Sequence, residues 1–200
     1  MHLNQMSWLR KVCRTFIITA VAGLAQFAYA DSETATAWGP SIGTTAPLLS
    51  ALDQDGKQQN LASLSSTNGL LFVFNRSVDW WPFCIRQFVK LNDLKDQFDA
   101  LGVGIAGMTY DKPEIIQAFD KKWDINFPVL KDVEREHVEA WGIRNQEYRP
   151  GTFAYGVPYP GVVLLSPDGK ILAKWAEKGY RSRADWSDVL EEVRTIVSDR

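Results

Sequence analysis

The sequence predicts an α/β domain in which a central mixed β-sheet is flanked by helices and preceded by an N-terminal hairpin. Two apolar runs, 69–75 and 102–110, have the length and the β-branched and aromatic content of strands buried on both faces. Segments with helical periodicity alternate with these runs. The order strand, helix, strand, helix, hairpin, helix is typical of a sheet covered by helices on both sides.

The first 30 residues predict a secretory signal peptide. Three basic residues lie between positions 10 and 14, an apolar run covers 16–28, and Ala28-Tyr29-Ala30 has the small-x-small pattern of a cleavage site. The apolar run is short and poor in leucine for a membrane span, although an uncleaved anchor is the alternative. We therefore expect cleavage after Ala30 and a periplasmic or secreted protein without a membrane span in its mature form.

After the signal peptide, we expect a flexible lead-in at 31–42 and one domain at 43–200. The signal segment holds three of the 22 basic residues and none of the 24 acidic ones, which leaves 19 against 24 and a net charge of −5. An acidic chain without a basic stripe does not predict nucleic acid or an anionic membrane surface as a partner.

The N-terminal part of the domain predicts a hairpin followed by a strand and a helix. Residues 46–64 hold two short strand-like pieces around the turn signal Asp55-Gly56. The buried strand 69–75 follows. Pro82 stands where a helix can begin, because the first helical residue needs no N–H, and the apolar stripe of this helix extends to about Leu101.

The second half repeats this alternation with shorter elements. Strand 102–110 precedes a helix at 112–123, for which Asp111 is the expected N-cap. A short strand, a short helix, a hairpin around the turn Asp168-Gly169 and an amphipathic C-terminal helix follow; their expected ranges are 127–130, 134–143, 161–178 and 184–199.

Neither a metal nor a cofactor is predicted. His and Cys side chains do not pair at ligand spacing, and the sequence has no glycine-rich phosphate loop. His137 is the single histidine after the signal peptide, and we interpret it as a solvated helix residue.

The stretch Asp79-Trp-Trp-Pro-Phe-Cys84 carries the chemistry of the chain. Cys84 is the only cysteine after the signal peptide, so an internal disulfide cannot form in the mature protein. A lone thiol in an oxidising compartment is either buried and inert or exposed and used.

This stretch and its surroundings resemble the thioredoxin fold, in particular its peroxiredoxin-like branch, the alkyl hydroperoxide reductase/thiol-specific antioxidant family. Four segments in the right order are similar to that family: 46–61, 71–94, 104–132 and 157–171. The resemblance implies a thioredoxin-like fold over about 43–197. It also implies a thiol-dependent peroxidase or thiol-disulfide oxidoreductase, with a peroxide or disulfide substrate and an external thiol reductant.

The resemblance also implies that the attacking cysteine is missing. In the family it occupies the position of Trp81, at a helix N-terminus that stabilises a thiolate. Peroxide-reducing members have a threonine three residues earlier and a proline four residues before that, where this chain has Val78 and Phe74. An indole cannot attack a peroxide, so the usual mechanism is excluded if Trp81 occupies that position.

Two interpretations of Cys84 follow. In the first, Cys84 is oxidised to a sulfenic acid and rescued by an outside thiol, with positive charge from Arg76, Arg86 or Lys90 if they lie near. In the second, Cys84 is a core thiol, because its helical stripe is apolar and free cysteine is usually buried. The protein is then catalytically degenerate.

The aromatic residues suggest a binding module as the alternative function. The resemblance implies that Pro160, after Tyr159, is a cis-proline facing position 81. Trp80, Trp81, Tyr159 and Pro160 would then line a groove for an extended peptide or a small apolar ligand. Trp81 could equally fill the space over an abandoned active site, which would leave a structural or accessory subunit.

Overall fold

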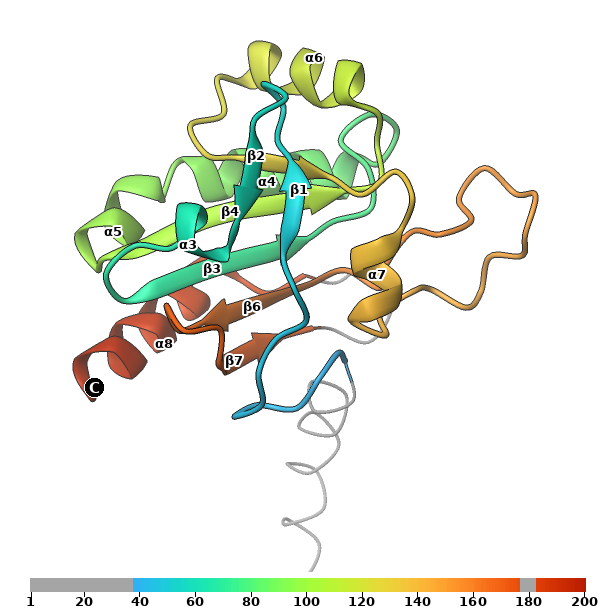
Figure 1. The fold of residues 1–200 in the computed structure, drawn as a ribbon. Helices are drawn as coiled ribbons and strands as arrows, with labels where there is room; N and C mark the ends of the chain where they lie inside the picture. Colours follow the sequence, from blue (N-terminus) through green and yellow to red (C-terminus); the bar gives the residue numbers. More distant parts are fainter. Residues whose placement is uncertain (1–37, 177–182) are drawn as a thin grey trace, which may run out of the picture. The chain divides into compact units, whose positions relative to one another are not determined.

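The computed structural model describes residues 38–176 and 183–200, which form the predicted α/β domain around a mixed sheet (Figure 1). The predicted signal peptide, its cleavage site and residues 31–37 of the lead-in lie outside the described residues. The elements in chain order are β1 Ser50–Leu52, β2 Gln58–Asn60, α3 Leu61–Leu64, β3 Gly69–Phe74, α4 Pro82–Asn92, α5 Lys95–Ala100, β4 Val103–Thr109, α6 Pro113–Trp123, β5 Val129–Lys131, α7 Glu136–Ala140, β6 Gly161–Leu165, β7 Ile171–Trp175 and α8 Trp186–Ser198.

Strand β3 lies at the centre of the five-stranded sheet that the described residues form. The strand order is β5-β4-β3-β6-β7. Strands β3, β4 and β5 are parallel, whereas β6 is antiparallel to β3 and β7 to β6. Strands β1 and β2 pair separately as the predicted N-terminal hairpin. The parallel half brings the carboxyl ends of β3 and β4 to the same edge, which is where α/β sheets commonly bind ligands.

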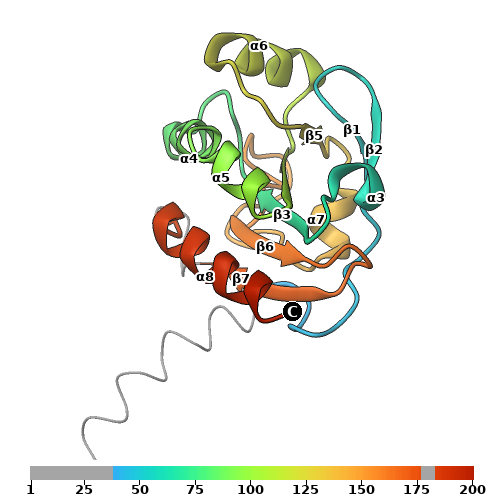
Figure 2. The same cartoon turned by 90° about the vertical axis from the view of Figure 1, so that its left-hand side faces the viewer.

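The alternation of side chains along β3 creates one apolar core on each face of the sheet. Leu71 and Val73 face a core completed by α4, α5, α6 and α8. Leu70, Phe72 and Phe74 face the opposite core, to which α3, α7 and Trp38 contribute. Figure 2 shows α4, α5 and α8 on one side of the sheet and the β1–β2 hairpin with α3 on the other. Burial on both faces explains why 69–75 is apolar throughout.

The single helix expected from Pro82 to about Leu101 is wrong, because the chain forms α4 and α5 with a break between them. The break follows Asn92, the last residue of α4. The Asn92 side chain donates to the Asp124 carbonyl (3.1 Å) and accepts from the Asn126 N–H (2.7 Å). These bonds tie the end of α4 to the loop after α6, so tertiary contacts override a continuous helical pattern.

Residues 38–42 of the expected lead-in pack against the domain. Trp38 is buried and its Nε1 donates to the Tyr159 carbonyl at 2.8 Å. The Lys174 ammonium on β7 donates to the carbonyls of Trp38 (2.7 Å) and Pro40 (2.8 Å). Within the described ranges, no helix is long and apolar enough to cross a membrane.

Candidate active site

Cys84 and the residues around it come from five separate parts of the chain. Strand β3 supplies Arg76 just beyond its end, α4 supplies Cys84 in its first turn, and β4 leads to Asp111. The long segment between α7 and β6, which projects on the right of Figure 1, supplies Tyr148. Arg183 precedes α8. The sheet thus gathers these residues at the carboxyl ends of β3 and β4.

The Cys84 thiol is fully buried between two nitrogen donors. Its relative exposure is 0%. The Arg76 backbone N–H donates to Sγ at 3.3 Å, and Arg183 Nη2 lies 3.6 Å from Sγ. Burial agrees with the core-thiol interpretation, whereas a guanidinium beside sulfur agrees with the one-cysteine interpretation. Both therefore remain predictions at this point.

Arg183 is the functional residue that the sequence did not reveal. It lies 99 positions from Cys84 in the chain and reaches the thiol from the start of α8. Burial lowers the pKa of Arg183, the contact with Cys84 raises it, and Arg76 lowers it further. The Arg76 backbone N–H and the Arg183 guanidinium are the two groups that contact the sulfur. Arg86 and Lys90, the other suggested cations, lie exposed on α4.

Arg76 is a buried cation held by aromatic rings. Its guanidinium carbon lies 4.6 Å from the ring centroid of Trp81, 5.0 Å from that of Tyr148 and 5.7 Å from that of Trp80. Nη2 also donates to the Tyr148 hydroxyl at 2.6 Å. Such stacking stabilises a desolvated cation, so Trp81 helps to hold the buried Arg76 side chain in place.

Trp80 and Trp81 form an aromatic cluster with the projecting segment. Their rings meet edge to face at 5.5 Å, and Trp80 meets Phe153 at 5.0 Å. Trp80 Nε1 donates to the Tyr110 hydroxyl at 3.0 Å. Trp81 is the N-cap of α4, without a side-chain capping bond. The cluster is half-exposed, and Phe153 keeps 77% of its surface accessible.

The expectation that Pro160 is a cis-proline is wrong, because the described residues contain no cis peptide bond. Tyr159, the residue before it, is held from both sides. Its N–H donates to the Ile143 carbonyl at 2.7 Å, and its own carbonyl accepts from Trp38 Nε1. Tyr159 packs against the core that contains Phe74, and Pro160 is buried. A groove that joins these two residues to Trp80 and Trp81 stays a prediction.

Asp111 is not the N-cap of α6, as the sequence predicted; Lys112 takes that position. The Asp111 carboxylate is buried and accepts from the Val78 N–H (2.7 Å) and the Ser77 hydroxyl (2.8 Å). Burial raises the pKa of Asp111, although these hydrogen bonds act to lower it. Asp111 thus anchors the loop that leads from β3 to Trp81 and Cys84.

The interpretation of His137 as a solvated residue is wrong, since it is only 7% exposed. Its Nε2 accepts from the Ser50 N–H (3.2 Å), so the proton sits on Nδ1, which faces the Asp132 carboxylate at 3.0 Å. Burial acts to raise the pKa of Asp132, but hydrogen bonds from His137 and Val138 lower it below its usual value. The described residues hold no group of three His, Cys, Asp or Glu side chains that could bind a metal.

The chain is similar to peroxiredoxins in both sequence and fold. It is 32% identical over 133 residues to peroxiredoxin Bcp of Escherichia coli K12. This aligned region covers 64% of this chain and 81% of that protein. The solved structure of peroxidoxin BcpB from Mycobacterium tuberculosis matches with a TM-score of 0.64 at 17% identity, over 79% of this chain and 96% of that one. A solved structure of peroxiredoxin Q from Xanthomonas campestris matches with a TM-score of 0.60 at 21% identity, over 76% of this chain and 90% of that one.

The AhpC/TSA family model matches residues 42–174, more than half of the chain. This range contains the whole sheet except the end of β7, together with Cys84 and its surroundings other than Arg183. The match confirms the resemblance on which the sequence analysis relied. The chain therefore belongs to the AhpC/TSA family and is a peroxiredoxin-like redox protein with the thioredoxin fold.

Proposed function

We propose that this protein is an exported antioxidant oxidoreductase that reduces peroxides with Cys84 as its single reacting thiol. The carrying observation is the position of Cys84 Sγ, between the Arg76 N–H at 3.3 Å and Arg183 Nη2 at 3.6 Å. An inert core thiol needs no cation beside it, whereas positive charge and N–H donors stabilise the thiolate that attacks a peroxide.

The reaction has three steps. The Cys84 thiolate attacks one peroxide oxygen, the O–O bond breaks, and a proton converts the leaving oxygen to an alcohol or water. Cys84 is thereby oxidised to a sulfenic acid. An external thiol then forms a mixed disulfide with Cys84 and releases water, and a second external thiol frees Cys84 and leaves as the disulfide. An external reductant is required because the mature chain carries no second cysteine.

Trp81 occupies the place of the family's attacking cysteine in this proposal. Its ring lies 4.6 Å from the Arg76 guanidinium, so Trp81 stabilises the buried side chain of the residue whose backbone N–H contacts Cys84 Sγ. Peroxide access to Cys84 requires Arg183 or the aromatic cluster to move, since the thiol is buried.

The test uses the full chain carrying Cys13→Ser, in which Cys84 is the single thiol. We expect one peroxide equivalent to give one sulfenic acid per chain, measured by mass spectrometry after trapping with a 1,3-dione. Arg183→Ala should slow this oxidation by about tenfold, the loss typical of one stabilising charged contact. Arg183→Lys should recover part of the rate.

A Cys84 that resists peroxide until the chain is unfolded would overturn the proposal. The protein would then be a catalytically degenerate member of the family, and binding by the aromatic residues would become the function to test. Export is tested separately: N-terminal sequencing of the protein recovered from the periplasm or medium should begin at Asp31.

A further inference from the structure

Asn75 is a buried polar residue to which the proposed mechanism gives no role. It directly follows β3, and it is only 1% exposed. Its backbone N–H donates to the Met108 carbonyl at 2.9 Å and so continues the sheet. Its side-chain oxygen Oδ1 has no hydrogen-bond partner among the described residues. A buried acceptor without a donor destabilises the fold, so a group that donates to Oδ1 during the reaction would account for it.

The side chain of Asn75 lies against the turn that carries Cys84. Its Nδ2 donates to the Cys84 carbonyl at 3.4 Å. The next residue, Arg76, donates its backbone N–H to Cys84 Sγ at 3.3 Å. Two consecutive residues after β3 thus hold Cys84, one at its carbonyl and the other at its sulfur. Because Oδ1 and Nδ2 of Asn75 share one carbon atom, the unpartnered acceptor lies beside the same turn.

A hydroperoxide that reacts with Cys84 needs an acceptor as well as donors. The Arg76 N–H and Arg183 Nη2, which contact Sγ at 3.3 and 3.6 Å, are both donors. A hydroperoxide that leaves water for this buried site retains its O–H hydrogen, and a buried O–H group without an acceptor is unfavourable. The side chain three residues before Trp81 cannot accept this hydrogen, because Val78 is apolar.

Other acceptors near Cys84 already have donors. The Trp81 carbonyl accepts from the N–H groups of Cys84 (2.9 Å) and Ile85 (3.2 Å). Each carboxylate oxygen of Asp111 accepts one hydrogen bond from the loop that it anchors. Of these acceptors, Asn75 Oδ1 alone has no donor among the described residues. It is therefore the acceptor in position for the hydrogen of the hydroperoxide.

We propose that Asn75 is a catalytic residue whose Oδ1 accepts the hydroxyl hydrogen of the hydroperoxide that Cys84 reduces. The inference rests on the proposed function and adds a residue to the same site. The Cys84 thiolate attacks the hydroxyl oxygen, an S–O bond forms, and the O–O bond breaks. The electron pair of the O–O bond leaves with the other oxygen, which takes up a proton from the solvent. The transferred hydroxyl becomes part of the sulfenic acid and still donates to Oδ1.

The test compares two reactions of Cys84, again in the Cys13→Ser chain. Hydrogen peroxide has an O–H hydrogen, whereas methyl methanethiosulfonate has no hydrogen to donate and reports how accessible and how nucleophilic the thiol is. We expect Asn75→Leu to slow oxidation by hydrogen peroxide by about tenfold, the effect of one hydrogen bond in the transition state. The rate with methyl methanethiosulfonate should stay nearly unchanged, so the ratio of the two rates falls.

A conservative variant tests the acceptor directly. Asn75→Asp retains an oxygen in the place of Oδ1, and its negative charge disfavours the thiolate of Cys84. We therefore expect both rates to fall in Asn75→Asp, while their ratio stays closer to that of the unsubstituted residue than in Asn75→Leu. A packing role for Asn75 does not predict this recovery of the ratio.

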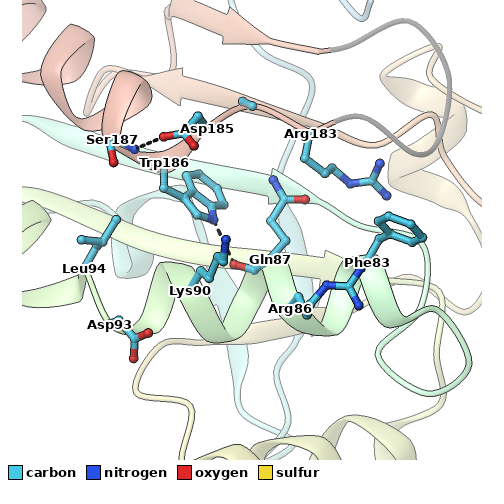
Figure 3. Close-up of a pocket in the computed structure, with 11 residues that line it drawn as sticks. Phe83, Arg86, Gln87, Lys90, Asp93, Leu94, Arg183, Asp185, Trp186 and Ser187 are labelled. Atoms are coloured by element: carbon cyan, nitrogen blue, oxygen red, sulfur yellow. Dashed lines mark hydrogen bonds between the residues drawn. The ribbon is translucent and has the colours of Figure 1, made fainter.

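Gln87→Leu is the matched control, because it removes another buried amide. Gln87 is 6% exposed, and its Oε1 also has no partner among the described residues. Figure 3 shows its amide in the cavity between α4 and the start of α8, and Cys84 does not line this cavity. We expect Gln87→Leu to leave the ratio of the two rates unchanged. A fall as large as that in Asn75→Leu would overturn the assignment of the acceptor to Asn75.

The outcomes separate this inference from the proposed function. If peroxide oxidises Cys84 and Asn75→Leu leaves the ratio unchanged, or slows both reactions equally, Asn75 is not the acceptor and the one-cysteine peroxidase stands. If Cys84 with Asn75 intact resists peroxide while the chain is folded, the proposed function fails and the inference fails with it. Should far-UV circular dichroism show that Asn75→Leu does not fold, Asn75→Ala takes its place, and the same outcomes decide.

Discussion

Removal of the Asp111 carboxylate should loosen the loop that positions the active site. This carboxylate accepts from the Val78 N–H at 2.7 Å and from the Ser77 hydroxyl at 2.8 Å. Removal of the carboxylate leaves the buried Val78 N–H and Ser77 hydroxyl without their acceptor, and each buried group left unsatisfied costs about 1–3 kcal/mol. We expect Asp111→Ala to lower the free energy of unfolding by about 2–4 kcal/mol at pH 7.

Asp111→Asn separates the hydrogen bonds from the charge. The amide oxygen can still accept from the Val78 N–H, while its NH₂ group must find the Ser77 oxygen, which already accepts from the Asp79 N–H at 3.1 Å. We expect a cost of about 1 kcal/mol. The matched control is Asp120→Ala on α6, whose carboxylate has no hydrogen bond within the described chain; its effect should stay within about 0.5 kcal/mol.

The pKa of Asp111 also predicts in which direction the folding stability changes with pH. Burial raises the pKa of Asp111, so the folded state binds its proton more tightly than the unfolded state does. The stability gained from protonated Asp111 is complete below its pKa in the unfolded state, about 3.9. It is lost as pH rises through the higher pKa that Asp111 has in the folded state. Wild-type stability should therefore decline relative to Asp111→Asn over that window.

Urea unfolding of each variant, followed by far-UV circular dichroism, measures these differences. The same proteins are assayed for Cys84 oxidation, which should slow in Asp111→Ala at a urea concentration where the chain is still folded. An Asp111→Ala protein whose stability is within about 0.5 kcal/mol of wild type, with an unchanged m-value, would show that the two hydrogen bonds do not anchor this loop.

Three further predictions concern other parts of the fold. Asp132→Asn should reduce the loss of stability that wild type shows below about pH 4. The pKa of Asp132 is lowered in the folded state, so its contribution to stability is present above that pH and is lost as pH falls. Unfolding midpoints measured across the acid range check this. Trp81→Cys should form an intramolecular disulfide with Cys84, seen as a loss of about 2 Da by mass spectrometry, because the Cys84 N–H bonds to the residue 81 carbonyl at 2.9 Å; two persistent thiols in air would contradict it. Gly107→Ala should cost about 1–3 kcal/mol, since its Cβ would lie 2.4 Å from Phe88 Cζ, and a neutral effect on the unfolding midpoint would refute this contact.

The sheet could be predicted from the sequence because its strands depend on local patterns. β3 and β4 are continuous apolar runs, and both faces of each are buried. The break between α4 and α5 could not be predicted, because the side-chain bonds of Asn92 that accompany it join residues more than 30 positions apart. The helical periodicity of a segment does not show such long-range contacts.

Only the part of the active site that lies in one local sequence motif could be predicted. Cys84 could be singled out as the one cysteine after the predicted signal peptide and within a family-like motif. Arg183 could not, since its 99-residue separation from Cys84 is closed only by the packing of α8 against α4. Asp111 was expected to cap the helix that follows it and His137 to be solvated, because local sequence does not show that their hydrogen-bond partners lie in other elements.

The proposed function requires Cys84 to be reactive although Trp81 stands where the family resemblance places the attacking cysteine. The dipole and free N–H groups of a helix N-terminus act within its first turn, and Cys84 is the third residue of α4. Its own N–H is already bonded to the Trp81 carbonyl, so the hydrogen bonds to the sulfur come from residues outside the helix. The Arg76 N–H and the Arg183 guanidinium are the groups in position to supply it. If they do, Arg183→Ala should slow peroxide attack while leaving the unfolding midpoint nearly unchanged; an equal loss in both would identify Arg183 as a packing residue.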